Sequence, residues 1–225
     1  MTSNSTTKLE GPRFGPIRGN KPKQLFILLH GVGADGQDLI ELAPTLSQAF
    51  PDASFVSPNA PYACDMAMRG YQWFSLQDRS PEKILSGVKE TAPILNDFID
   101  DEMVRYGVNS DQTVLLGFSQ GTMMGLFVAP RRKRLLAGVV GFSGRLIAPK
   151  LLEDEVKSHP PVLLVHGDAD EVVPVDSVNI AKDGLIAAGI KTAVVIRPGL
   201  GHGIDMEGIK EATTFLNDCF KAKKS

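Results

Sequence analysis

The sequence predicts an α/β protein with a mostly parallel central sheet and helices on both faces. Short apolar, β-branched runs alternate along the 225-residue chain with longer amphipathic stretches, a pattern typical of parallel strands joined by helices. A glycine-rich turn that carries a serine follows one of the apolar runs and opens a helix-like stretch. We find no internal repeat or linker, so we expect one domain over residues 9–225, preceded by a disordered tail over residues 1–8.

The strands and helices are assigned from these two kinds of run. Six short apolar runs are expected to form strands: 25–29, 54–57, 114–117, 138–142, 162–166 and 193–197. Six amphipathic stretches are expected to form helices: 38–50, 81–106, 120–128, 150–157, 176–188 and 204–221. The second helix has Ser-Pro-Glu at its start, which is a strong N-terminal signal.

Residues 58–80 contain no convincing regular element, although they are rich in large apolar side chains. Loops of this length inside a domain are usually functional or disordered, and the aromatic content argues against disorder. We therefore expect this segment to form a wall over the functional site. Its large apolar residues are Tyr62, Met66, Met68, Tyr71, Trp73, Phe74 and Leu76.

Composition excludes several classes of partner. The net charge is −2, so no overall field recruits nucleic acid or an anionic membrane. The basic run Arg131–Arg134 is interpreted as a solvated helix end. No secretory leader and no membrane-spanning apolar run is found, and the two cysteines, Cys64 and Cys219, form no metal-ligand spacing. We expect a cytoplasmic protein without a metal, without a nucleic-acid partner and without stable membrane insertion.

The sequence Gly-Phe-Ser-Gln-Gly at residues 117–121 identifies Ser119 as the candidate nucleophile. Small residues two before and two after a serine let the chain turn sharply from strand to helix and expose the hydroxyl above the sheet. Gly-Phe-Ser-Gly at residues 141–144 resembles a second such turn, but Arg145 stands where the last glycine is required. We interpret Ser143 as structural.

A serine hydroxyl needs a base within hydrogen-bond reach and an acid that orients the base. Of the four histidines, only His202 lies after the candidate acid and is flanked by glycines, so we expect it to be the base. His30 and His166 are expected to shape their loops, and His159 to be exposed beside two prolines.

Two carboxylates compete for the acid, because Asp168 and Asp170 both follow the strand at 162–166. Spacing alone does not separate them. Asp168 could cap the turn, which is a common role of aspartate. Asp170 lies further into the loop and could reach the histidine loop, so we favour Asp170.

Two backbone N–H groups are needed to stabilise the charge that develops on the substrate oxygen. Gln120 follows the nucleophile at a helix N-terminus and supplies one. Val32, between Gly31 and Gly33, is expected to supply the other. The same loop lacks the glycine spacing of a phosphate-binding loop, which makes that alternative weak.

These motifs together resemble the phospholipase/carboxylesterase family of α/β-hydrolases, which includes acyl-protein thioesterases. The resemblance rests on residues 29–36, 58–61, 70–74, 117–121, 166–170 with Val173-Pro174, and 201–202, and it extends from about Pro12 to the last helix. It implies the α/β-hydrolase fold with no separate cap domain, the triad Ser119, Asp170 and His202, and the oxyanion donors Val32 and Gln120.

The resemblance further implies that no cofactor is needed, that residues 71–74 border the acyl site and that a homodimer can form. We expect Tyr71, Trp73 and Val172 to contact the substrate. The expected activity is hydrolysis of small-molecule carboxylic esters with short to medium acyl chains. The alternatives are an acyl-thioesterase or lysophospholipase, and, from another class, a ligand-binding protein on a hydrolase scaffold with negligible turnover.

Overall fold

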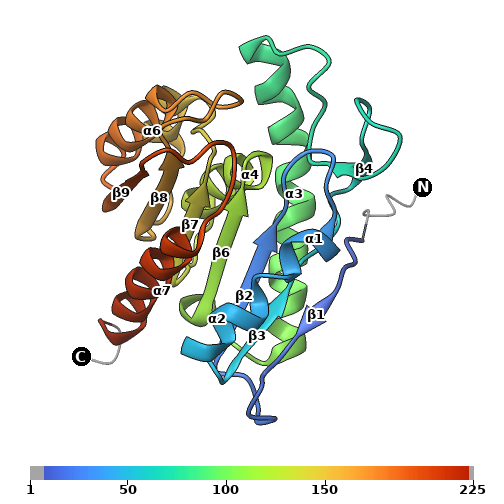
Figure 1. Cartoon of the computed structure of the whole chain (residues 1–225), viewed down its shortest axis with the longest axis vertical. Helices are drawn as coiled ribbons and strands as arrows, with labels where there is room; N and C mark the ends of the chain where they lie inside the picture. Colours follow the sequence, from blue (N-terminus) through green and yellow to red (C-terminus); the bar gives the residue numbers. More distant parts are fainter. Residues whose placement is uncertain (1–7, 223–225) are drawn as a thin grey trace.

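A seven-stranded sheet forms the centre of the molecule in the computed structural model, which describes residues 8–222 (Figure 1). The strand order is β1-β3-β2-β6-β7-β8-β9, and every neighbouring pair is parallel except β1 with β3. The strands are β1 (Arg13–Phe14), β2 (Gln24–Leu29), β3 (Ala53–Val56), β6 (Thr113–Phe118), β7 (Gly138–Phe142), β8 (Val162–Gly167) and β9 (Thr192–Arg197). The predicted fold class is confirmed.

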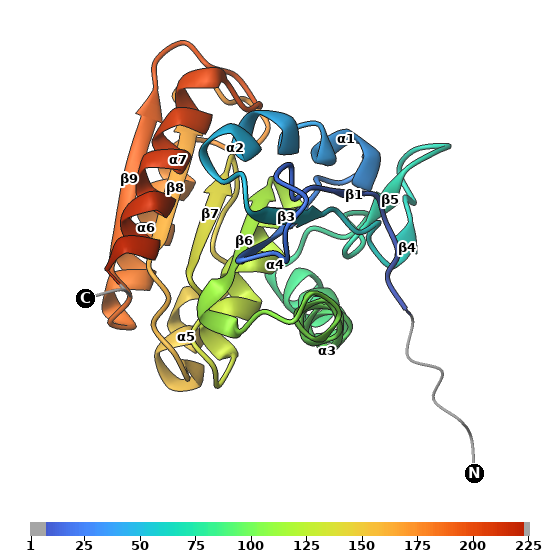
Figure 2. The same ribbon diagram turned by 90° about the horizontal axis from the view of Figure 1, so that it is seen from below.

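Helices cover both faces of the sheet, as Figure 2 shows from below. One face is covered by α1 (Gly36–Ile40), α2 (Ala43–Ala49) and α7 (Met206–Lys221). The opposite face is covered by α3 (Pro81–Tyr106), α4 (Gln120–Val128), α5 (Pro149–Glu155) and α6 (Asp176–Ala187). Two 3-10 turns, η1 (Ser110–Gln112) and η2 (Ala129–Arg131), lie before β6 and after α4.

The strands are apolar throughout because both of their faces are buried. In β2, Leu25 and Ile27 belong to the core on the α3 side, whereas Phe26 and Leu28 belong to the core on the α7 side. All four side chains are fully buried. Burial of each such side chain contributes about 1.5–3 kcal/mol of transfer free energy. Strands buried on only one face would instead alternate between apolar and polar residues.

Helix boundaries differ from the prediction mainly near the N-terminus. The single helix expected over residues 38–50 is wrong, since α1 ends at Ile40 and α2 begins at Ala43. Pro44 is the physical reason: it has no N–H to donate to the carbonyl of Ile40, so a continuous helix would lose a hydrogen bond there. Proline is tolerated instead in the first turn of a new helix, where α2 places it.

The segment 58–80 also differs from the prediction, because it contains a two-stranded antiparallel hairpin. Strand β4 (Tyr62–Ala63) pairs with β5 (Tyr71–Gln72) in the register Tyr62 to Gln72. Strand β1 was likewise not predicted. All three strands are two residues long, too short for a periodic pattern to reveal them. The tail predicted at residues 1–8 lies outside the described residues except for Lys8.

Parallel pairing brings the carboxyl ends of the central strands to one edge of the sheet. Leu29 of β2 is level with Gly117 of β6, and Phe118 of β6 is level with Phe142 of β7. The loops that follow β2, β6, β7 and β8 therefore meet at this edge, which is where open α/β sheets bind their ligands.

Candidate active site

Ser119 lies on a strained turn between β6 and α4. Its φ of 52° and ψ of −113° put a non-glycine residue in a region that costs about 1–3 kcal/mol. The turn can be this tight only because residues 117 and 121 lack a Cβ. A Cβ at Gly121 would overlap the carbonyl of Leu29, and one at Gly117 would come within 2.5 Å of the Gly121 carbonyl carbon. The two glycines are thus required by close backbone approach, as the motif predicted. Ser119 is held by a hydrogen bond from its N–H to the carbonyl of Phe142, 2.9 Å long.

The structure brings Asp170 and His202 together from two different loops. The Nδ1 of His202, which follows β9, is 2.8 Å from Oδ2 of Asp170, which follows β8. The other carboxylate oxygen, Oδ1, accepts hydrogen bonds from the N–H groups of Val172 and Val173, at 2.9 and 2.8 Å. Because Nδ1–H donates to the carboxylate, Nε2 of the neutral His202 is free to accept a proton.

Asp170 stays ionised in this setting. Burial acts to raise its pKa, but the hydrogen bonds from Val173, His202 and Val172 together outweigh burial and hold the pKa below its ordinary value. Its side chain is fully buried, whereas that of His202 is 19% exposed. The carboxylate can therefore support a positive charge on His202 while the imidazole remains accessible.

The imidazole of His202 lies beside the turn that carries Ser119. Its ring packs against Phe118, the residue before Ser119, with ring centroids 4.9 Å apart. Ser143, which follows β7, contacts the loop of His202, since its Oγ donates a hydrogen bond of 3.4 Å to the carbonyl of Gly203. The residues predicted as nucleophile, base and acid thus converge at one edge of the sheet.

Asp168 does not reach His202 but braces the loop that carries it. Its Oδ1 accepts a hydrogen bond from the N–H of Gly199, 2.7 Å long, at a position where Gly199 has a φ of +69°. The two aspartates, which spacing could not separate, therefore have different partners: Asp170 contacts the imidazole and Asp168 fixes the backbone that precedes it.

The remaining histidines have structural contacts. His30 donates from Nδ1 to the carbonyl of Gly31 at 2.7 Å and accepts at Nε2 from the N–H of Ala60 at 2.9 Å. Burial lowers the pKa of His30, so the ring is neutral. His159 is exposed, as predicted.

His166 contacts the acid, which the sequence analysis did not foresee. Its Nε2 donates to the carbonyl of Val173 at 2.8 Å and is also 3.4 Å from Oδ2 of Asp170. Its side chain is almost fully buried, as that of Asp170 is. His166 therefore shapes the acid loop, as predicted, and its ring also lies next to the Asp170 carboxylate.

The two predicted oxyanion donors lie on adjacent segments. Gln120 is the first residue of α4, so its N–H has no acceptor inside the helix. The loop that carries Val32 is fixed by hydrogen bonds of 2.8 Å from Gly33 N–H to the Tyr71 carbonyl and from Tyr71 N–H to the Ala34 carbonyl. No carbonyl of residues 8–222 accepts a hydrogen bond from the N–H of Val32.

The Gln120 side chain joins these segments, which the sequence did not reveal. Its Oε1 accepts from the N–H of Trp73 at 2.8 Å, and its Nε2 donates to the carbonyl of Phe74 at 2.7 Å. The Trp73 indole in turn donates to the carbonyl of His30 at 2.9 Å. The nucleophile turn, β5 and the loop of Val32 are therefore connected by buried hydrogen bonds.

The position of Trp73 corrects one expectation about substrate contacts. Its side chain is completely buried, so it has no surface to offer a substrate and instead supports the Val32 loop. Tyr71 and Val172 are exposed by 36% and 68%. Their contact with substrate stays a prediction.

An apolar groove lies beside the site and was not predicted. It has a volume of about 260 Å³ and lies between the N-terminus of α3 and residues 145–148, with Leu85, Leu146 and Ile147 in its walls. Gly144 comes directly before the lining residues 145–148 and packs against the Ser119 turn, since a Cβ at Gly144 would lie 3.0 Å from the carbonyl oxygen of Ser119. The apolar pair Leu146-Ile147, four residues after the end of the predicted strand 138–142, was the signal available in the sequence.

Comparison with known proteins identifies relatives of this chain. The sequence profile of the family described as Phospholipase/Carboxylesterase matches residues 17–220. Esterase YpfH of Escherichia coli (strain K12) is 30% identical over 198 residues, which cover 88% of this chain and 84% of that protein. Acyl-protein thioesterase 1 homolog 1 of Dictyostelium discoideum is 28% identical over 85% of this chain and 88% of its own length.

Solved structures show the same likeness. The crystal structure of esterase PE8 superposes with a TM-score of 0.90 at 42% identity, covering 94% of this chain and 99% of that one. The Bacillus cereus carboxylesterase, at 18% identity and a TM-score of 0.75 over 96% of each chain, shares the fold. With a family match over residues 17–220 and a relative at 30% identity, the chain belongs to the phospholipase/carboxylesterase family.

Proposed function

We propose that this protein is a carboxylesterase that acts through Ser119, His202 and Asp170. The observation that carries the proposal is the 2.8 Å contact of His202 Nδ1 with Asp170 beside the strained Ser119 turn. Family membership and the esterase relatives support the same reaction class. The expected substrates are small-molecule esters.

The reaction follows from the positions of these groups. Ser119 Oγ attacks the ester carbonyl carbon while Nε2 of His202 takes the hydroxyl proton, and Asp170 stabilises the imidazolium that forms. The N–H groups of Val32 and Gln120 donate to the oxyanion. His202 then returns the proton to the departing alkoxide, which leaves an acyl-enzyme. Water, deprotonated by His202, releases the acid and restores the serine.

A panel of esters with acyl chains from two to sixteen carbons tests this proposal directly. We expect repeated turnover with the highest kcat/KM on short to medium chains, because the groove of about 260 Å³ buries only part of a long chain. Stoichiometric release without a second turnover would favour the ligand-binding alternative. Matched thioesters in the same panel test the acyl-thioesterase alternative, which the relatives named acyl-protein thioesterase 1 support.

The groove makes a prediction about acyl length. Leu85→Ala is expected to lower kcat/KM on octanoate by roughly tenfold and on acetate hardly at all, because each methylene that loses its apolar contact forfeits about 0.8 kcal/mol. Leu85 is only half-buried, so the fold should tolerate the change. Val172→Ala is the matched control, because Val172 lies on the acid loop and does not line the groove. Equal losses on both esters after Leu85→Ala would exclude the groove as the acyl site.

The pH dependence of the reaction is a further prediction. We expect kcat/KM to rise between about pH 6 and pH 7, the range in which an imidazole loses its proton, because the base must be neutral. Asp170 does not contribute to this limb, since its lowered pKa keeps it ionised throughout. His166→Asn should leave the midpoint in place. A midpoint displaced by a full pH unit in that variant would make His166 part of the proton transfer.

Location and assembly stay predictions from the sequence and the family. Among residues 8–222, no helix is long and apolar enough to cross a membrane. Cytoplasmic location is supported by the low cysteine content. Light scattering on the purified chain tests the homodimer that the family resemblance implies.

A further inference from the structure

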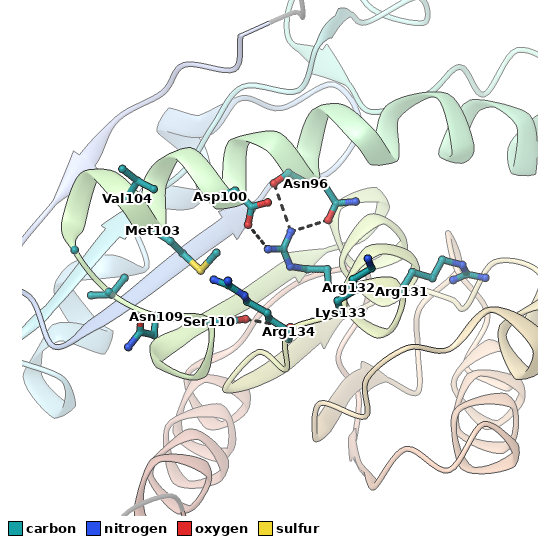
Figure 3. Close-up of a pocket in the computed structure, with 12 residues that line it drawn as sticks. Asn96, Asp100, Met103, Val104, Asn109, Ser110, Arg131, Arg132, Lys133 and Arg134 are labelled. Carbon is teal, nitrogen blue, oxygen red and sulfur yellow. Dashed lines mark hydrogen bonds and ion pairs between the residues drawn. The ribbon is translucent and has the colours of Figure 1, made fainter.

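A hollow lies at the edge of the sheet opposite Ser119. Its volume is about 790 Å³, and it is bounded by the C-terminal half of α3, by residues 107–110 and by the basic run Arg131–Arg134 (Figure 3). Strand β6 begins at this edge and ends at the nucleophile turn, so roughly 20 Å of strand separates the two sites. The hollow is therefore no part of the ester site.

Positive charge dominates the lining. Of the twelve lining residues, four are cationic and one, Asp100, is a carboxylate. The interpretation of the basic run as a solvated helix end is wrong for its first two members, whose side chains are only 12% and 6% exposed. Arg131 pairs with Glu155 at 2.6 Å, and Arg132 pairs with Asp100 and with Asn96 Oδ1.

Several hydrogen-bond donors of the basic run Arg131–Arg134 lack an acceptor among the described residues. Arg131 Nη2 and Arg132 Nε are buried and have no hydrogen-bond partner among residues 8–222. The salt bridges of the described chain include neither Lys133 nor Arg134. Figure 3 shows the Arg134 side chain extending across the hollow toward Met103. Lys133 and Arg134 are exposed cations of the lining that none of these salt bridges includes, so each can take an anionic acceptor.

The rest of the lining is apolar or neutral. Met103, Val104 and Val108 form an apolar side, and the Val104 side chain is 83% exposed. Ser110 Oγ donates to the Arg134 carbonyl at 3.1 Å, which fixes the basic run against the loop before β6. A ligand that fits has an anionic group and an apolar body, and the volume is in the range of small-molecule sites.

We propose that this hollow is a second binding site, for an organic phosphate with an apolar or aromatic body. A phosphate monoester carries between one and two negative charges at neutral pH, which matches Lys133 and Arg134, whereas a carboxylate carries one and would leave a cation unmatched. The phosphate lies between these two side chains, and the body lies on Met103, Val104 and Val108.

Calorimetric titration of the full chain with adenosine monophosphate, inorganic phosphate and adenosine tests the proposal. We expect adenosine monophosphate to bind more tightly than either fragment, because it alone engages both the cations and the apolar side. Arg134→Gln should weaken that binding by about tenfold, the usual loss for one charge-assisted hydrogen bond. Its backbone bond to Ser110 is retained, so the melting temperature should stay unchanged.

Arg145→Gln is the matched control, because Arg145 lies in the groove beside Ser119. It should leave the affinity for adenosine monophosphate unchanged. If adenosine monophosphate binds no more tightly than inorganic phosphate, the assignment to an organic phosphate is wrong. Equal affinities for the native chain and Arg134→Gln, or an equal loss in Arg145→Gln, would place the ligand elsewhere. None of these measurements depends on esterase turnover.

Discussion

Replacement of Ser119 by alanine is expected to lower kcat by about a millionfold, to the residual rate that the oxyanion donors and substrate binding sustain. The loss is this large because every covalent step passes through the Ser119 oxygen. The fold should survive, since the N–H that bonds to the Phe142 carbonyl belongs to the backbone and is retained. Steady-state kinetics on an acetate ester, with the melting temperature measured alongside, checks both statements.

Ser143→Ala is the matched control for this variant. Ser143 also has a positive φ, 47°, at the end of the neighbouring strand, so the two serines are similar in backbone and burial. Its hydroxyl contacts the Gly203 carbonyl rather than an imidazole. We expect Ser143→Ala to retain turnover within about tenfold, in line with the loss of one weak hydrogen bond. A millionfold loss in this variant alone would transfer the role of nucleophile to Ser143.

The second large effect is expected from Asp170→Asn, which should lower kcat by roughly ten thousandfold. The asparagine amide would donate toward Nδ1 of His202 and so favour the tautomer whose proton is on Nε2, where it cannot accept from serine. The variant also removes the charge that stabilises the imidazolium. Rates should therefore remain low across the whole pH range in which the native chain is active.

Asp168→Asn separates this effect from a general disturbance of the acid loop. Asp168 accepts a hydrogen bond from Gly199 and is exposed at the start of the same loop. An asparagine oxygen can accept the same bond, so we expect a modest loss of stability and turnover close to native. If kinetics and melting curves show the reverse pattern for the two aspartates, the acid is Asp168.

The sheet and the nucleophile turn could be predicted because their signals are local. Strands buried on both faces are continuous apolar runs, and the structure confirms all six predicted strands to within one or two residues. The Ser119 turn was legible because close backbone approach leaves only glycine at 117 and 121. Likewise, the order of motifs sufficed for the family, which the match over residues 17–220 confirms.

The parts that were missed depend on contacts between distant segments. Trp73 was expected to contact the substrate because it lies in a long loop rich in apolar residues that the family resemblance places at the acyl site. In the structure its backbone N–H donates to the Gln120 side chain, its indole donates to the His30 carbonyl, and the side chain is fully buried. No spacing rule connects residues 73 and 120. The groove at 145–148 and the buried contact of Arg132 with Asn96 also join α3 to segments distant in sequence, and Arg131 reaches Glu155 of α5 in the same way.

Covalent labelling with a fluorophosphonate probe, followed by peptide mapping, tests the central claim most directly. The probe phosphonylates a serine, with loss of fluoride, only where a base activates the hydroxyl and donors stabilise the resulting charge. We predict one label per chain, on Ser119, with labelling abolished in Ser119→Ala and strongly slowed in Asp170→Asn. A label on Ser143, or undiminished labelling of Ser119→Ala, would contradict the assignment of Ser119 as the nucleophile.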